Sequence, residues 1–196
     1  MRRLLASILL LTIAGAPSWT AQRSGVTARL RGLSAASERV IWASGSGNTI
    51  LRTEDGGATW RPVASPTTDG LDFRDIDAVG ENVAYVLSID KGPLSRIYKT
   101  TNAGATWTLQ FKNEDPDAFF DAMTFWDAAH GIAGSDSVNG AFVIVTTRDA
   151  GRSWARVAAK RLPPALPNEG AFAASGTNVA VFGDNHVWFA SRNAML

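Results

Sequence analysis

The sequence predicts an all-β protein: a β-propeller of four-stranded antiparallel blades, with three complete repeats and a partial fourth in an open arc. One eight-residue pattern, Thr-x-Asp/Asn-x-Gly-x-Thr/Ser-Trp, occurs at 53–60, 100–107 and 147–154, and consecutive copies are 47 residues apart. Short β-prone runs flank every copy. Four such runs per repeat, at a period of about 40–50 residues, are typical of propeller blades.

The first 22 residues have the pattern of a secretory signal peptide. Arg2 and Arg3 give a positive start, and residues 4–16 carry no charge. This run is shorter than the about 20 apolar residues that a transmembrane helix needs, and its length suits the hydrophobic region of a signal. We therefore expect a signal peptide over 1–22 and a secreted or periplasmic mature chain without a transmembrane span.

The β-prone runs divide 28–196 into blades at 28–65, 70–112, 118–160 and 168–196. Runs of β-branched, aliphatic and aromatic residues between turn-forming residues identify the strands. We expect strands at 30–33, 40–43 and 49–51; at 73–79, 83–89, 96–98 and 107–111; at 122–125, 131–134 and 142–145; and at 171–174, 179–182 and 187–190. A closed ring needs at least about four blades, so the partial fourth repeat predicts a truncated propeller.

The repeated pattern has the composition of a hairpin turn. Its Asp or Asn can bond to the backbone two residues on, and its Gly can take the positive φ that other residues resist. The Trp returns to the sheet as an apolar anchor whose indole N–H needs a partner. Because the copies lie one per blade and far apart on the rim, we assign their defining residues a structural role. These residues are Thr53, Asp55, Gly57, Thr59, Trp60, Thr100, Asn102, Gly104, Thr106, Trp107, Thr147, Asp149, Gly151, Ser153 and Trp154.

Composition excludes several kinds of site. The chain has 19 Lys+Arg against 18 Asp+Glu, so its net charge gives no sign of nucleic-acid binding. It has no Cys and two His, which removes disulfides, thiolate zinc sites and His-rich metal sites. We expect no metal and no cofactor.

The repeated pattern looks like the Asp-box, or BNR repeat, of sialidase-like β-propellers. The wider chain resembles bacterial secreted proteins of the photosystem II stability/assembly factor-like group, over residues 28–190. The stretches that carry this resemblance are 71–75, 95–101, 119–123 and 166–176. The resemblance implies a secreted propeller, and it does not choose a function because one fold serves many functions.

Four charged residues near the starts of the expected inner strands are candidates for binding at the mouth of the channel: Arg74, Asp75, Asp121 and Glu169. Two carboxylates there could act as acid and base if they were about 5–9.5 Å apart. The alternative, which we favour, is that they bond to the backbone of the inner strands, as buried polar groups generally do.

Two functions stay open. The first is a non-catalytic propeller that binds a protein partner or serves as an assembly scaffold. The second is a glycoside hydrolase of the sialidase or glucanase type. Sialidase-like enzymes carry an Arg-Ile-Pro signature, which is absent here, and a tyrosine nucleophile, whereas Tyr85 and Tyr98 fall within strand runs. We therefore expect no catalytic residue and a protein partner, and the open blade edges also predict self-association.

Overall fold

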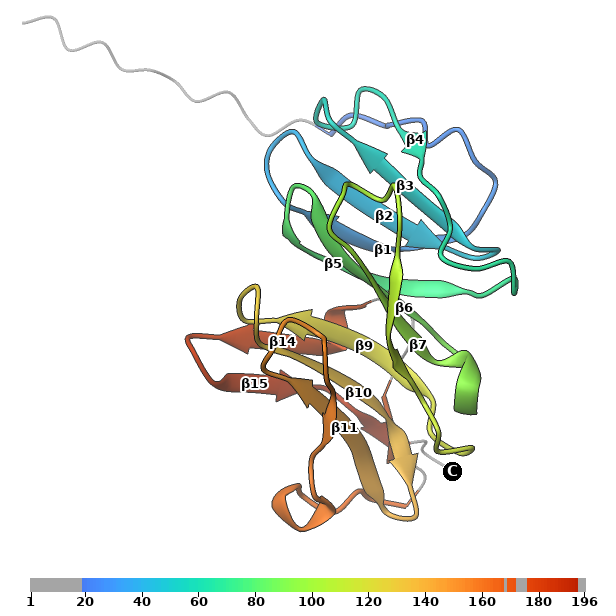
Figure 1. Ribbon diagram of the computed structural model, residues 1–196. Coiled ribbons are helices and arrows are strands. Elements are labelled where there is room, and N and C mark those ends of the chain that lie inside the picture. The colour runs from blue at the N-terminus through green and yellow to red at the C-terminus, as the bar shows by residue number, and fades with distance from the viewer. Residues whose placement is uncertain (1–18, 168, 172–175, 194–196) are drawn as a thin grey trace, which may run out of the picture.

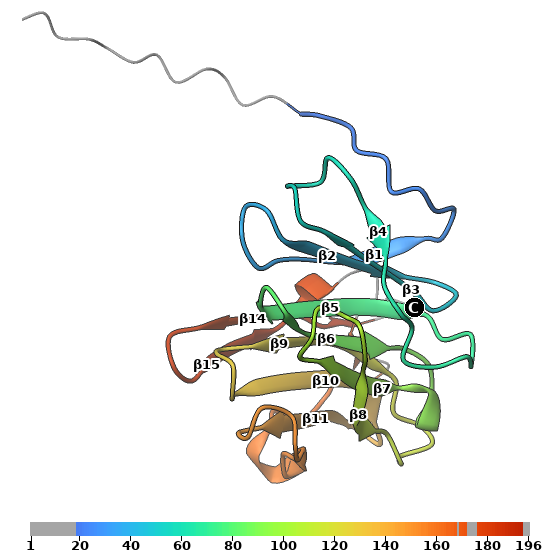
Figure 2. The same ribbon diagram turned by 45° about the horizontal axis from the view of Figure 1, so that its top comes forward.

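The structure is a computed structural model that describes residues 19–167, 169–171 and 176–193. Within these ranges the chain forms three four-stranded antiparallel sheets in succession, each with its strands in chain order. Figures 1 and 2 show the sheets one after another from the top of the molecule to the bottom. Most of the expected signal peptide lies outside the described residues.

The three sheets are the blades of the predicted fold. The first blade contains β1 (Leu30–Ala35), β2 (Ile41–Gly45), β3 (Thr49–Thr53) and β4 (Arg61–Pro62). The second contains β5 (Phe73–Gly80), β6 (Val83–Ser88), β7 (Arg96–Thr100) and β8 (Thr108–Lys112). The third contains β9 (Phe120–Phe125), β10 (Gly131–Val138), β11 (Ala141–Thr147) and β12 (Ala155–Arg156).

In each blade the repeated pattern forms the turn between the third and fourth strands. In the second blade, β7 ends at Thr100, β8 begins at Thr108, and Tyr98 pairs with Leu109 across the turn. The period of 47 residues therefore corresponds to one blade, and the predicted all-β arc of antiparallel blades is confirmed.

The fourth unit departs from the regular blade. β14 (Val179–Phe182) pairs with β15 (His186–Phe189), close to the strands expected there. β13 (Glu169–Gly170) pairs separately with β16 (Arg192–Asn193), a contact that the sequence pattern did not predict because both strands have only two residues. The inner strand expected at 171–174 falls mostly outside the described residues.

Apolar clusters fill the spaces between consecutive units. Trp42 of the first blade and Phe73 of the second are fully buried in one cluster. Leu87 and Phe120 lie in a second cluster between blades 2 and 3, and Ile144 belongs to a third between blade 3 and the β14–β15 hairpin. Full burial of a large apolar side chain stabilises the fold by about 1.5–3 kcal/mol, so these clusters hold the units together.

The first strands of the blades lie side by side at the inner edge of the arc. β1 contacts β5, β5 contacts β9, and the 3-10 helix η3 (Gly176–Asn178) contacts all three strands. Two other 3-10 helices, η1 (Gly92–Leu94) and η2 (Ala159–Arg161), lie in connections. None of the helices in the described part of the chain is long and apolar enough to cross a membrane.

Candidate functional site: carboxylates of the inner strands

The acidic residue of each repeated turn is used by the turn itself. Asp55 Oδ1 accepts hydrogen bonds from Thr59 N (2.8 Å) and Thr53 Oγ1 (2.7 Å), and its Oδ2 accepts one from Thr59 Oγ1 (2.6 Å). The Thr59 bonds lower the pKa of Asp55 to about 2, and those of Ser153 lower the pKa of Asp149 to about 2. The carboxylate oxygens of Asp55 and Asp149 are therefore engaged in hydrogen bonds within their own turns at the rim of the arc.

The second copy of the turn shows that the negative charge is dispensable. Asn102 Oδ1 accepts a hydrogen bond from Thr106 N (2.9 Å), as Asp55 does from Thr59, while Asn102 Nδ2 donates to Thr106 Oγ1 (2.8 Å). The amide oxygen keeps the bond from the backbone N–H, and the amide nitrogen reverses the direction of the bond to the hydroxyl, so an acceptor for the backbone rather than a charge defines this position.

The glycine and tryptophan of the turn contact the preceding blade. Gly104 has a φ of 83°, and a Cβ added to it would lie 2.9 Å from Val63 Cβ in the first blade. The Trp107 indole donates a hydrogen bond to Ala64 O (2.8 Å), also in the first blade. A side chain at position 104 would be strained and would separate the blades.

Two aspartates of β5 bridge the second and third blades at the inner edge. Asp75 Oδ2 accepts a hydrogen bond from Met123 N (2.7 Å), and Asp77 Oδ2 accepts one from Phe125 N (2.9 Å). The two amides lie two residues apart on β9, and the two aspartates lie two residues apart on β5, so both pairs of residues face each other along one edge of β9. The side chains thus satisfy donors that an uncovered edge strand would present.

Asp75 is enclosed as well as bonded. Its second oxygen, Oδ1, accepts a hydrogen bond from Ile76 N (2.9 Å), and only 5% of the residue is exposed. Burial raises the pKa of Asp75 to about 7, although the Met123 and Ile76 amides act against that rise. Gly176 of η3 lies against this carboxyl, because a Cβ there would approach Asp75 Oδ1 to 2.1 Å.

Asp121 has different surroundings. It is 1% exposed, and its Oδ2 has no hydrogen-bond partner among the described residues. Burial raises the pKa of Asp121 to about 8, with a further contribution from the neighbouring carboxyl of Asp136 on β10, while the charge of Arg74 acts in the opposite direction. Asp136 Oδ1 accepts a hydrogen bond from Ala171 N (2.7 Å). Asp121, which is buried, and Asp136, which is half-buried, are therefore neighbouring carboxyls whose pKa values are both raised, chiefly by burial.

The four channel-mouth candidates do not form one cluster. Arg74 lies near Asp121, and Arg74 Nε is 3.5 Å from Asp72 Oδ2. Glu169 instead caps its own connection, since its carboxylate accepts hydrogen bonds from Leu166 N (2.6 Å) and from the Ser191 hydroxyl.

Sequence reasoning missed two acidic residues of the inner edge. Asp77 could have been found from its spacing of two residues after Asp75, which places both side chains on the same side of a strand. Asp136 gives no such signal, because it reaches Asp121 from the neighbouring strand only through the pairing of β9 with β10.

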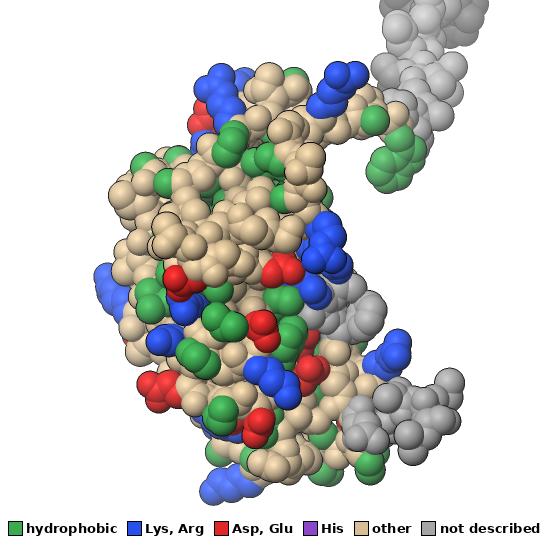
Figure 3. Space-filling model, turned by 90° about the vertical axis from the view of Figure 1, so that its right-hand side faces the viewer, with side chains coloured by type: hydrophobic (Ala, Val, Ile, Leu, Met, Phe, Trp, Pro, Cys, Tyr) green, Lys and Arg blue, Asp and Glu red, His purple; other side chains and the backbone are tan. Residues whose placement is uncertain are grey.

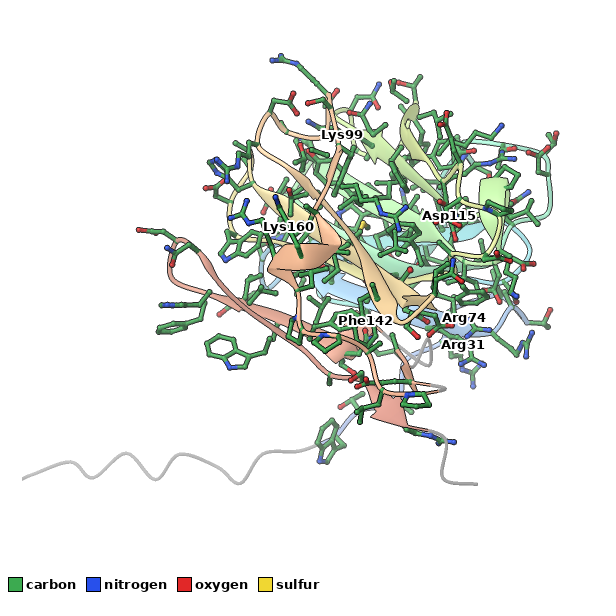
Figure 4. The ribbon with its side chains drawn as sticks, turned by 90° about the horizontal axis from the view of Figure 1, so that it is seen from below. Arg31, Arg74, Lys99, Asp115, Phe142 and Lys160 are labelled. Carbon is green, nitrogen blue, oxygen red and sulfur yellow. The ribbon has the colours of Figure 1, made fainter. Side chains whose placement is uncertain are left out.

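A pocket of about 350 Å³ lies where the three inner strands meet η3. Its polar lining includes Arg31, Ser34, Asp77, Thr124 and Thr177. Figure 4 shows Arg31 and Arg74 on the same side of the molecule. In Figure 3, Lys/Arg and Asp/Glu side chains are interspersed on the face shown rather than separated by sign.

The comparisons with known proteins concern the fold. No protein-family model matches the sequence, and a search of curated proteins gives no match. A solved structure described as YCF48 bound to D1 peptide is similar, with a TM-score of 0.54 and 18% identity over 66% of this chain and 40% of that chain. A GH74 enzyme from Niastella koreensis is similar with a TM-score of 0.50 and 16% identity, over 64% of this chain and 21% of that chain.

The chain thus spans less than half the length of either solved structure. One of the two is described by a bound peptide and the other as an enzyme, so the likeness is shared by proteins of different function. What the likeness shows is the fold: the chain is an arc of β-propeller blades.

Proposed function

We propose that the protein is a non-catalytic, secreted or periplasmic propeller that binds a protein segment and acts as an assembly scaffold. The observation that carries this proposal is that Asp75 and Asp77 are both engaged in hydrogen bonds between blades. Both carboxylates accept hydrogen bonds from the β9 backbone, and Asp75 is 5% exposed. A carboxylate that bonds two blades together in a buried position is not available to transfer a proton to a substrate.

The pocket beside these carboxylates suits an extended peptide. It combines hydroxyls of Ser34 and Thr124, the Arg31 guanidinium and apolar parts of Leu33 and Met123. Donors, acceptors and apolar surface in one concave site are what an extended backbone with alternating side chains requires. The peptide in the YCF48 structure supports the same class of ligand for this chain.

A display library of random peptides tests the binding function. We expect the purified protein to enrich a defined set of sequences, and Thr124→Arg, which fills the pocket, to lose their binding. Leu109→Arg is the matched control, because Leu109 is 46% exposed on β8, outside the residues that line the pocket. Absence of enrichment, or equal binding by Thr124→Arg, would contradict the proposal.

Export is tested separately. We propose that residues 1–22 direct the chain out of the cytoplasm, from the positive start and uncharged run of that segment. A fusion of these residues to a reporter that is active only after export should be active. The same fusion with Leu9→Arg and Leu10→Arg should be inactive, because charges disrupt the apolar region; equal activity would refute the signal.

Glycoside hydrolysis is the second candidate function. The raised pKa values of Asp121 and Asp136 favour it, because glycosidases use one protonated and one ionised carboxyl, although these two carboxyls lie within hydrogen-bond reach of each other and glycosidase carboxyls are about 5–9.5 Å apart. A panel of fluorogenic glycosides should give no turnover if the scaffold proposal is right. Turnover that Asp121→Asn abolishes, with the fold intact by circular dichroism, would replace the scaffold with the enzyme.

A further inference from the structure

The contact between blades 1 and 2 and the contact between blades 2 and 3 are made by equivalent residues. The turn glycine of the following blade meets the preceding blade, at Val63 for Gly104 and at Tyr85 for Gly151. The turn tryptophan lies beside it, and the Trp107 ring meets Trp42 edge to face at 6.1 Å. Each blade therefore has two different faces: one that packs against a preceding blade, which we call the receiving face, and one that packs against a following blade.

The first blade presents its receiving face with no blade before it in the described part of the chain. Gln22 lies at the turn instead: Gln22 Nε2 donates to Gly56 O (3.2 Å), and the Trp60 indole donates to Gln22 Oε1 (3.1 Å). Toward the inner strand this face is uncovered, because Leu30 is 37% exposed and Leu33 is 70% exposed. Both leucines line an open pocket of about 390 Å³ that Trp60 also borders.

The β14–β15 hairpin presents the opposite kind of face. Val179 and Val181 pack against the third blade, so the alternation of a strand turns Phe182 outward. Trp188 pairs with Ala180 and therefore shares the outward side. Phe182 is 72% exposed and Trp188 is 59% exposed. The hairpin projects from the remainder of the molecule in Figure 4, and the second edge of β15 is unpaired within the described ranges.

We propose that a second copy of this chain covers these faces, with the Phe182–Trp188 side of one copy packed on the Leu30–Leu33 side of the next. The occupant follows from the repeat. The two faces are the two halves of a contact that the chain makes between blades 1 and 2 and again between blades 2 and 3. Exposed apolar faces of this kind mark association sites. The contact joins unlike surfaces, so it is head-to-tail, and it closes into a ring or continues as a polymer.

Sedimentation velocity on the purified full chain, over a range of concentrations, tests the proposal. We expect association that increases with concentration and that Leu33→Glu and Phe182→Glu each abolish. Leu109→Glu, a charge placed on an exposed leucine of β8 away from both faces, should associate as the wild type does. Circular dichroism and thermal melting establish that each variant is folded.

A mixture of Leu33→Glu and Phe182→Glu distinguishes a head-to-tail contact from one between like faces. In a head-to-tail contact, the intact Phe182 face of Leu33→Glu can still meet the intact Leu33 face of Phe182→Glu, so the mixture should form one-to-one dimers although neither variant associates alone. A wild-type chain that stays monomeric at every concentration would overturn the proposal. Association that Phe182→Glu blocks and Leu33→Glu leaves unchanged would overturn it too, because it would join like faces.

Discussion

Asp75 and Asp121 stand near the starts of consecutive inner strands, and their surroundings differ. Asp75 accepts hydrogen bonds from the amides of Met123 and Ile76, whereas Asp121 Oδ2 has no hydrogen-bond partner in the described part of the chain and a second carboxyl beside it. A regular blade follows Asp75, while an irregular unit follows Asp121. The role of an inner-strand carboxylate is therefore set by the unit that comes after it.

The largest effect is expected where two blades meet at a tryptophan. Trp107→Ala removes the ring that contacts Trp42 and donates to Ala64 O, so we expect a loss of about 3 kcal/mol in the free energy of unfolding. Trp188→Ala, at the exposed face of the hairpin, should change the stability of the monomer far less. Urea unfolding measures both, and equal losses would contradict the distinction between closed and open faces.

A smaller loss is expected at the bridging carboxylate. Asp75→Ala leaves the amides of Met123 and Ile76 without their acceptor, and an unsatisfied buried donor costs about 1–3 kcal/mol. Asp117→Ala, an exposed aspartate in the connection to the third blade, is the matched control. If both variants unfold at the same urea concentration as the wild type, Asp75 does not hold the blades together.

Asp121 should make stability depend on pH. Burial raises the pKa of its carboxyl from 3.8 to about 8, so the folded state retains a proton that the unfolded state loses. Its contribution to stability is full below pH 4 and is lost as the pH rises to about 8. Asp121→Asn removes the titrating group, so its melting temperature should fall less than that of the wild type from pH 5 to pH 8. An equal fall in melting temperature for the two proteins between pH 5 and pH 8 would refute this prediction.

The smallest effect is expected at the exposed turn. Asp149→Ala removes the acceptor for Ser153 N and Ser153 Oγ, and we expect the melting temperature to fall by roughly 2–4 °C. Asp149→Asn should recover most of that loss, because Asn102 already fills the equivalent position. A carboxylate whose pKa is lowered to about 2 stabilises the fold above pH 4, and this contribution is lost as the pH falls toward 2. Failure of Asn to restore the melting temperature would show that the charge matters.

The blades could be predicted from the sequence because each is encoded locally. The turn residues and the alternating runs fix strands and hairpins within one repeat, and the pairs of β5 through β8 follow that pattern. The hydrogen bonds from Asp75 and Asp77 were harder to predict from the sequence, because each aspartate accepts from an amide 48 residues further along the chain. The β13–β16 contact and the Asp121–Asp136 pair depend on the path of the fourth unit, which no period in the sequence describes.

Hydrogen exchange at two amides tests the central claim, that the inner carboxylates are structural bridges. In the wild type, the amides of Met123 and Phe125 should exchange as slowly as those of the β10–β11 ladder. Asp75→Ala should speed exchange at Met123 more than at Phe125, and Asp77→Ala should do the reverse, because each substitution removes the acceptor of one of these amides. Fast exchange at both amides in the wild type, or exchange that neither substitution changes, would contradict the claim.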